Sequence, residues 1–290
     1  MKIGFLQSYS PENIAFSKEH GFTSAELRVG PNDEFFPGKD GWEEKALEVK
    51  EEYEGAGIEI SCLAGFYVNH MDPEREEEYK DLVRKTVLLA EKMGVEVVAG
   101  FAGRVPGLEP MECIPKFKEI WGEHAKFAQD HGAKIAFENC PMGRFHLPPG
   151  GINMMCLPDV WEAAFNEVPS DALGLEWDPS HLICMFIDPV ANLRQFGSKV
   201  YHVHAKDAHV HQDLLAKYGV YHEGVIEHCF PGLGDTDWGL AIKELRRQGY
   251  DGGLNIEGWH DAVFRDHPGG PQWEREGLLL ALKHLSQWVV

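Results

Sequence analysis

The sequence alternates eight short apolar segments with longer amphipathic ones, and this alternation restricts the folds open to the chain. Short apolar runs separated by helical stretches are typical of repeated strand–helix units that build a parallel sheet. We predict strands at Ile3–Leu6, Ser24–Val29, Ile58–Phe66, Val95–Phe101, Lys134–Asn139, Leu173–Asp178, Val200–Lys206 and Gly253–Glu257.

Proline and glycine mark the ends of the intervening helices. A proline in the first turn suits a helix start, and a glycine just past the last turn suits a helix end. The segment after Met93 shows this, because Gly94 separates a helical stretch from the next apolar run. We predict helices at Ser10–His20, Trp42–Gly55, Asp72–Met93, Glu112–His131, Asp159–Glu167, Asp188–Phe196, Trp238–Gln248 and Trp273–Val290.

Eight strand–helix units without a linker predict a single (β/α)8 TIM barrel over residues 1–290, since such a barrel takes about 250 residues. A doubly wound open sheet is the alternative, but it would carry a glycine-rich turn after the first strand, and Leu6-Gln7-Ser8-Tyr9 has none. Segments 141–158 and 207–234 are too long for ordinary turns. Both come after strands, so we interpret them as lid segments on the carboxyl rim, where barrel enzymes build their sites.

The charge balance bears on the class of partner. Lys and Arg number 27 against 47 Asp and Glu, a formal net charge of −20, which argues against a nucleic-acid partner. The sequence has neither a signal-peptide pattern nor an apolar run long enough for a membrane helix. Its six cysteines are scattered without a C-x-x-C pair, as expected of reduced thiols. We expect a cytoplasmic protein with no membrane partner.

Four consecutive predicted strands carry potential metal ligands at or near their carboxyl ends, among them Glu138, Asp178, His204 and Glu257. The carboxyl ends of barrel strands meet around one mouth, so these side chains can converge. An ionised side chain at the end of an apolar strand is costly unless it is paired or bound to a metal. Three carboxylates and one imidazole suit one divalent ion, Mn²⁺ first, with Mg²⁺, Co²⁺ or Zn²⁺ as alternatives.

The chain resembles the xylose isomerase-like sugar phosphate isomerases and epimerases, which are related to the family 2 apurinic endonucleases. The resemblance is carried by Phe137-Glu138-Asn139, Trp177-Asp178-Pro179-Ser180-His181, His202-Val203-His204-Ala205-Lys206-Asp207, the run from Gly232 to Trp238, and Ile256-Glu257. It implies that Glu138, Asp178, His204 and Glu257 bind the metal and that Glu138 and Glu257 also act as the acid/base pair. It further implies that His181 contacts a substrate oxygen and that the protein is a homodimer or homotetramer.

Several reactions are compatible with this ligand set. Removal of a proton next to a ketone creates an enediolate, which a divalent ion stabilises as a Lewis acid. Two carboxylates can then return the proton, which gives isomerisation or epimerisation of a keto-sugar or related polyol. The same intermediate would also serve a lyase or dehydratase acting on an inosose or a 3-keto-glycoside. An apurinic endonuclease is a minor alternative, because the fourth strand ends Gly100-Phe101-Ala102-Gly103 without a ligand.

Further polar residues are candidates for substrate binding. Lys206 shares strand parity with His204 and could face the site or pair with an acid. Glu26 could bind a sugar hydroxyl or pair with Arg28. Trp259, with His260 after it, could line the pocket, and His70 comes after the third strand.

The remaining histidines and glycines are ambiguous. We interpret His202 as a hydrogen-bonded core residue. Gly232-Leu233-Gly234 could cradle a phosphate or form a tight turn, and the absence of a basic cluster beside it favours an unphosphorylated substrate. Four histidines in the second long segment are expected to be exposed lid residues: His209, His211, His222 and His228.

Overall fold

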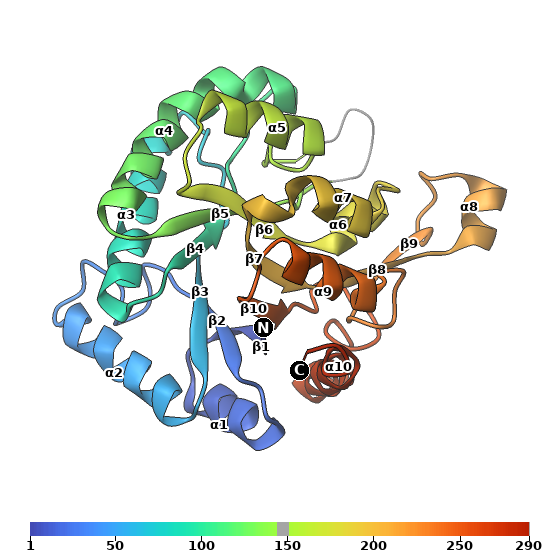
Figure 1. Cartoon of the computed structure of the whole chain (residues 1–290), viewed down its shortest axis with the longest axis horizontal. Coiled ribbons are helices and arrows are strands. Elements are labelled where there is room, and N and C mark those ends of the chain that lie inside the picture. Colours follow the sequence, from blue (N-terminus) through green and yellow to red (C-terminus); the bar gives the residue numbers. More distant parts are fainter. Residues whose placement is uncertain (144–150, 290) are drawn as a thin grey trace.

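The computed structural model describes residues 1–143 and 151–289, and its centre is a closed barrel of eight parallel strands (Figure 1). The strand order around the barrel is β1-β10-β7-β6-β5-β4-β3-β2, and β1 pairs with β2 to close the ring. The predicted TIM barrel is therefore confirmed. Its strands are β1 (Lys2–Ser8), β2 (Ser24–Arg28), β3 (Glu59–Phe66), β4 (Val97–Gly100), β5 (Lys134–Glu138), β6 (Leu173–Trp177), β7 (Val200–Ala205) and β10 (Gly253–Ile256).

Helices surround the barrel, as Figure 1 shows. Ser10 caps the first of them by accepting the backbone N–H of Asn13, and Gly94 ends the third in the left-handed conformation, as the sequence predicts. The third helix starts at Glu76 rather than at the predicted Asp72, and Val290 at the predicted end of the last helix lies outside the described residues. The surrounding helices are α1 (Pro11–His20), α2 (Trp42–Gly55), α3 (Glu76–Met93), α4 (Ile114–Asp130), α5 (Pro158–Glu167), α7 (Pro189–Phe196), α9 (Trp238–Arg247) and α10 (Pro271–Leu285), with 3₁₀ turns at Pro110–Cys113 and Gly197–Lys199.

The main apolar core lies between the barrel and these helices. Its largest members are four tryptophans whose side chains are fully buried: Trp121, Trp161, Trp177 and Trp238. Each such ring removes a large apolar area from water, which stabilises the fold at about 25 cal/mol per Å². No helix of the described ranges is both long and apolar enough to cross a membrane.

The segment after β7, predicted to be part of a lid over 207–234, contains regular structure. It forms an antiparallel hairpin of β8 (Asp207–Val210) and β9 (Ile226–Cys229), with α8 (Gln212–Tyr218) between them. Figure 1 shows this arm projecting from the barrel beyond the ring of helices. Ala208, Val210 and Val225 pack with Ile183 and Cys184 in a small apolar cluster at its base.

One buried carboxylate, that of Asp207, ties the two ends of this arm together. Its Oδ1 accepts the N–H groups of Ala208 and Thr236, both at 3.0 Å. Its Oδ2 accepts the N–H of Gly232 at 3.2 Å and the indole N–H of Trp238 at 3.0 Å. A Cβ at Gly234 would lie 2.4 Å from Oδ1, so the glycine turn packs on this carboxylate. This geometry accounts for the turn without a phosphate.

Asp207→Asn is expected to lower the free energy of unfolding by about 2–3 kcal/mol, because an amide nitrogen would face buried N–H donors. Chemical denaturation followed by tryptophan fluorescence measures the loss. Asp213→Asn, on the exposed surface of α8, is the control and should change stability by less than about 0.5 kcal/mol. An Asp207 variant as stable as this control would contradict the anchoring role.

The other long segment, predicted over 141–158, lies partly outside the described residues, which omit 144–150. Asn153 fixes the described part to the barrel. Its amide donates to the carbonyls of Glu138 and Cys140, both at 2.8 Å, and its Oδ1 accepts the N–H of Ala102 at 3.2 Å. These bonds hold Cys140 beside the carboxyl end of β5.

A short helix that the sequence did not predict, α6 (Pro179–Cys184), comes directly after β6. Asp178 caps it, because its Oδ1 accepts the N–H of Ser180 at 2.8 Å. The cap orients the Asp178 side chain at the barrel mouth, and the helix carries His181 there.

Candidate metal centre and active site

The structure brings the four predicted metal ligands together. Their ligand atoms all lie within 4.8 Å of one another. Glu138 ends β5, Asp178 comes directly after β6, His204 is the penultimate residue of β7, and Glu257 comes directly after β10. Because β5, β6, β7 and β10 are consecutive in the barrel, their carboxyl ends form one half of the mouth.

The donor set of this quartet fits a divalent cation. Oxygen and imidazole ligands suit Mn²⁺, Mg²⁺, Co²⁺ and Zn²⁺. Asp178 Oδ2 is buried and accepts no hydrogen bond, although the His181 ring lies 3.3 Å away. Buried polar atoms are otherwise almost always satisfied, so an oxygen of this kind, aimed into a group of ligands, is what a cation site provides.

The two glutamates of the quartet differ in electrostatic environment. Burial opposes ionisation of Glu138, but hydrogen bonds with His181 and His204 outweigh it and hold the pKa of Glu138 well below its usual value. Burial raises the pKa of Glu257, and repulsion from Glu138 adds to it. Lys206 opposes that shift through an ion pair of 2.8 Å between its Nζ and Glu257 Oε2. The sequence predicts that Lys206 either faces the site or pairs with an acid. In the structure Lys206 lines the cavity and also pairs with Glu257.

His181 lies beside the quartet and beside a residue that the sequence did not single out. Its Nε2 is 3.6 Å from Glu138 Oε1, and Glu138, Cys140 and His181 form a second group of possible ligands. Burial lowers the pKa of His181, but Cys140 and Asp178 outweigh it and hold that pKa well above its usual value. Cys140 has the same strand parity as Glu138, which is the signal that could have identified it.

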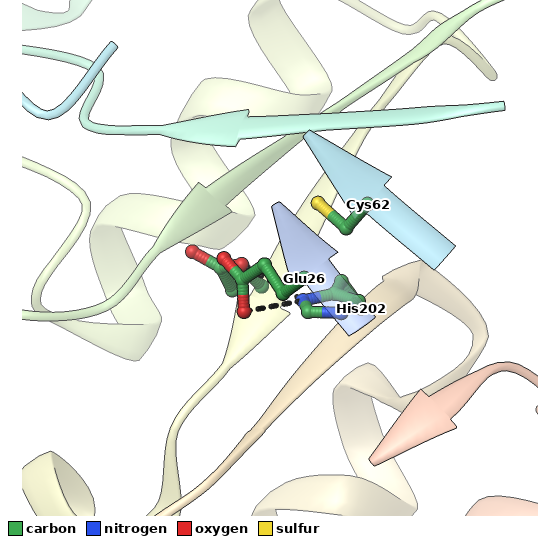
Figure 2. Close-up of side chains that lie close together, drawn as sticks. Glu26, Cys62 and His202 are labelled. Carbon is green, nitrogen blue, oxygen red and sulfur yellow. Dashed lines mark hydrogen bonds and ion pairs between the residues drawn. The ribbon is translucent and has the colours of Figure 1, made fainter. Parts of the chain in front are cut away.

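A buried polar network lies inside the barrel next to His204. Glu26, Cys62, Glu176 and His202 offer ligand atoms within 4.8 Å of one another, and Figure 2 shows Glu26, Cys62 and His202 together. Glu176, His202 and Oε1 of Glu26 already hydrogen-bond within the protein. His202 Nδ1 is 2.8 Å from Glu176 Oε1, and the Tyr67 hydroxyl donates to Glu176 Oε2 at 2.7 Å. We therefore assign this cluster to support of the mouth rather than to a second ion.

His204 links that network to the quartet. Its Nδ1 lies 3.3 Å from Glu138 Oε1, whereas its Nε2 lies 2.9 Å from Glu26 Oε2. A metal-binding imidazole usually donates its other N–H to a carboxylate, which fixes the ring and its tautomer. Glu26 thus contacts a predicted metal ligand and makes no ion pair with Arg28, one of its predicted partners.

His202 is the buried, hydrogen-bonded core histidine that the sequence predicts. Its Nε2 lies 2.7 Å from the Asn255 amide, and burial lowers the pKa of His202 to about 4.

A cavity of about 310 Å³ opens over the quartet. This is within the range of small-molecule sites. Glu138, His204 and Glu257 line its floor together with His181 and Lys206. Trp259 and His260 line it as predicted, and the lining residues that the sequence did not single out include Arg28, Tyr67, Phe101 and Cys140.

His70 does not reach this cavity. It is buried among Phe66, Tyr79 and Trp121 between the barrel and the helices, and its Nε2 is 3.1 Å from the Phe66 carbonyl. Burial lowers the pKa of His70 to about 4. The predicted substrate contact is therefore not supported by its position, because the side chain packs among core rings rather than over the mouth.

Only His222 of the four arm histidines is fully exposed, as predicted. His209, His211 and His222 are on the arm surface, the first two paired with Asp235 and Glu227 at 2.8 and 2.9 Å. His209 and His211 are only partly exposed. His228 instead turns toward the site, with its ring 5.4 Å from that of His181. Burial, with nearby Lys206 and His181, lowers the pKa of His228 to about 2.

Fold and site together define a class: a (β/α)8 barrel with a candidate divalent-metal centre at its carboxyl mouth. The chain belongs to the xylose isomerase-like TIM barrel family, whose model matches residues 14–283. The family resemblance seen in the sequence is thereby confirmed.

The chain is also similar to several proteins of known sequence or structure. An uncharacterized Bacillus subtilis protein, YfiH, is 26% identical over 240 residues, which are 74% of this chain and 75% of that protein. A D-psicose 3-epimerase from Clostridium cellulolyticum H10, solved with D-tagatose, has a TM-score of 0.70 at 16% identity over 100% of this chain and 99% of its own. The probable 3-DHS dehydratase AsbF from Bacillus anthracis has a TM-score of 0.70 at 17% identity over 99% of both chains. An IolI protein with a bound zinc atom has a TM-score of 0.69 at 17% identity, over 100% of this chain and 97% of its own. At these identities the solved structures establish the fold alone.

Proposed function

We propose that this protein is a divalent-metal-dependent isomerase or epimerase of a keto-sugar or related polyol. The observation that carries the proposal is the convergence of Glu138, Asp178, His204 and Glu257 beneath one cavity of small-molecule size. The epimerase among the structural neighbours supports it. We propose Mn²⁺ as the ion, and the zinc-bound neighbour keeps Zn²⁺ as the alternative.

The metal ion and the side chains have different roles in the proposed reaction. A divalent cation, when bound by the quartet, supplies Lewis-acid stabilisation of negative charge on substrate oxygens. Glu257, which lines the cavity beside Lys206, is the residue that removes the proton next to the carbonyl. Glu138, whose pKa is low, is ionised before the reaction, so it returns a proton to the enediolate only after it has taken that proton from Glu257 or from solvent.

Three neighbouring groups complete the reaction. Lys206 stands 2.8 Å from Glu257, where its ammonium steadies the ionised form of the base and any negative charge formed beside it. His181 faces the cavity within reach of a substrate hydroxyl. Trp259 offers an apolar ring for sugar C–H groups. Together they orient a polyol over the two glutamates.

A dehydratase is the second candidate, favoured by the fold match to AsbF and by His228 beside His181. The His181 imidazolium, whose pKa is raised, would donate to a hydroxyl next to the enediolate the proton that lets water leave. Elimination and isomerisation share the first proton transfer and differ in the second step, which is loss of water in one case and return of the proton in the other.

Proton exchange and ultraviolet absorbance separate these candidates. Metal-loaded protein is incubated in D2O with ketohexoses, with their 6-carboxylates and with an inosose, and products are followed by NMR. The proposed function predicts deuterium at a carbon next to the carbonyl and a rearranged, saturated product. An unsaturated, ultraviolet-absorbing product would establish the dehydratase instead. The absence of exchange with every compound would refute both.

Glu26→Gln is expected to weaken metal binding by about 10–100-fold, because His204 would lose the carboxylate that orients its ring. Competition against a fluorescent chelator measures the affinity. Glu59→Gln, an exposed carboxylate on the neighbouring strand β3, is the matched control and should leave it unchanged. Equal affinities in the two variants would show that Glu26 plays no part in the metal centre.

A further inference from the structure

Arg28 is a cation of the active-site cavity that the proposed reaction does not use. It is the last residue of β2, its side chain is exposed, and it lines the same cavity as Glu138 and Glu257. Within residues 1–143 and 151–289, no carboxylate lies at ion-pair distance from its guanidinium. Arg28 interacts electrostatically with the Asp33 carboxylate. That carboxylate, however, accepts a hydrogen bond from the N–H of Gly30 at 2.8 Å.

The Arg28 guanidinium lies beside an aromatic ring at the rim of the cavity. It lies 5.8 Å from the ring centroid of Trp259, which is two residues beyond Glu257 in the sequence. A second guanidinium, that of Arg265, lies 3.8 Å from the same ring but is paired with Asp266 at 2.8 Å. Arg265 does not line the metal cavity. The two arginines thus share one ring and differ in whether they have a carboxylate partner.

The barrel order places Arg28 across the mouth from the centre of the metal quartet. In the ring β1-β10-β7-β6-β5-β4-β3-β2, strand β2 is four strands from β6 in either direction, and Asp178 comes directly after β6. A substrate held by its carbonyl end at the quartet would extend its far end toward β2. The cavity of about 310 Å³ contains both positions.

We propose that Arg28 binds a carboxylate at the end of the substrate remote from the carbonyl, so that the substrate is a keto-sugar acid. This inference rests on the proposed function and names the substrate class for the same site. A planar guanidinium matches a carboxylate through two parallel hydrogen bonds. The cavity's other cation outside the histidines, Lys206, is already paired with Glu257. One arginine without a carboxylate partner therefore suits a monoanionic carboxylate better than a phosphate dianion.

Arg28 also changes how the negatively charged protein attracts or repels an anionic substrate. With a net charge of −20 and two glutamates on the cavity floor, the site repels an anionic substrate. Arg28 at the rim offsets that repulsion where the substrate carboxylate would lie, and so selects the acid over the neutral sugar.

The test compares two probes that differ only at the far end, D-fructose and D-fructuronate, in calorimetric titrations of the metal-loaded protein. We expect the uronate to bind at least about tenfold more tightly, the gain expected of a charge-assisted bidentate pair. Arg28→Gln should remove that preference and leave fructose affinity within about twofold. Arg28→Lys should keep part of it. Arg265→Gln is the control, because it removes the same charge over the same ring outside the cavity.

Each outcome decides the proposal. Equal affinities for the two probes, a preference that survives in Arg28→Gln, or no binding of the uronate would overturn it. Fructose 6-phosphate is the third probe, and tighter binding of this phosphate through Arg28 would replace the carboxylate assignment. Deuterium exchange into the substrate is measured separately, as the test of the proposed function. An Arg28-dependent preference without exchange would refute the proposed function alone, and exchange without the preference would refute the Arg28 site alone.

Discussion

Glu257→Gln is expected to lower turnover by at least about 10²–10⁴-fold while the protein stays folded. Glutamine has nearly the same shape as glutamate but cannot accept the substrate proton. The substitution also leaves the buried ammonium of Lys206 without its partner at 2.8 Å, which adds to the loss. Turnover by NMR, thermal melting and metal content are measured on the same preparation, so that a loss of chemistry is separated from a loss of metal.

Glu138→Gln should have a comparable effect, because the second glutamate must return or relay the proton. Glu227→Gln is the control for both, since this carboxylate lies on the arm and pairs with His211 away from the cavity. Full activity of either the Glu138 or the Glu257 variant, with metal bound, would contradict the mechanism that uses two carboxylates.

Removal of the metal by a chelator is expected to abolish turnover and to lower the melting temperature, and addition of Mn²⁺ should restore both. The physical reason is the crowding of three carboxylates within 4.8 Å, whose mutual repulsion a cation relieves. A ligand at a hundred times its dissociation constant stabilises the native state by about 2.7 kcal/mol. Elemental analysis of the purified protein identifies the resident ion, and Zn²⁺, Co²⁺ and Mg²⁺ are compared with Mn²⁺ in the recovery.

The outcome is informative in both directions. If the chelator changes neither the activity nor the melting temperature, and analysis finds no metal, the ion plays no part in the mechanism. A melting temperature that falls without loss of activity would leave the quartet as a structural site.

Much of the fold could be predicted because each strand–helix unit carries its own local signals. Apolar runs set the strands, and capping residues such as Ser10 and Gly94 set helix ends within a few residues. The repetition of these units predicted the closed barrel. The arm from Asp207 to Cys229 could not be predicted in this way, because its hairpin depends on anchoring at Asp207 and on packing against α6.

The sequence by itself determined the quartet, because the carboxyl ends of parallel barrel strands all lie at one mouth. Strand position predicts that one carboxylate or imidazole from each of these strands can converge, and the family resemblance implies that these are Glu138, Asp178, His204 and Glu257. The contacts between distant segments were decided only by the tertiary structure. Strand periodicity says which face a side chain takes but not what lies across the barrel from it. For that reason the structure was needed to show that Glu26 contacts His204, that His70 lies behind the barrel wall, and that Arg28 lies at the rim of the cavity without a carboxylate partner among the described residues.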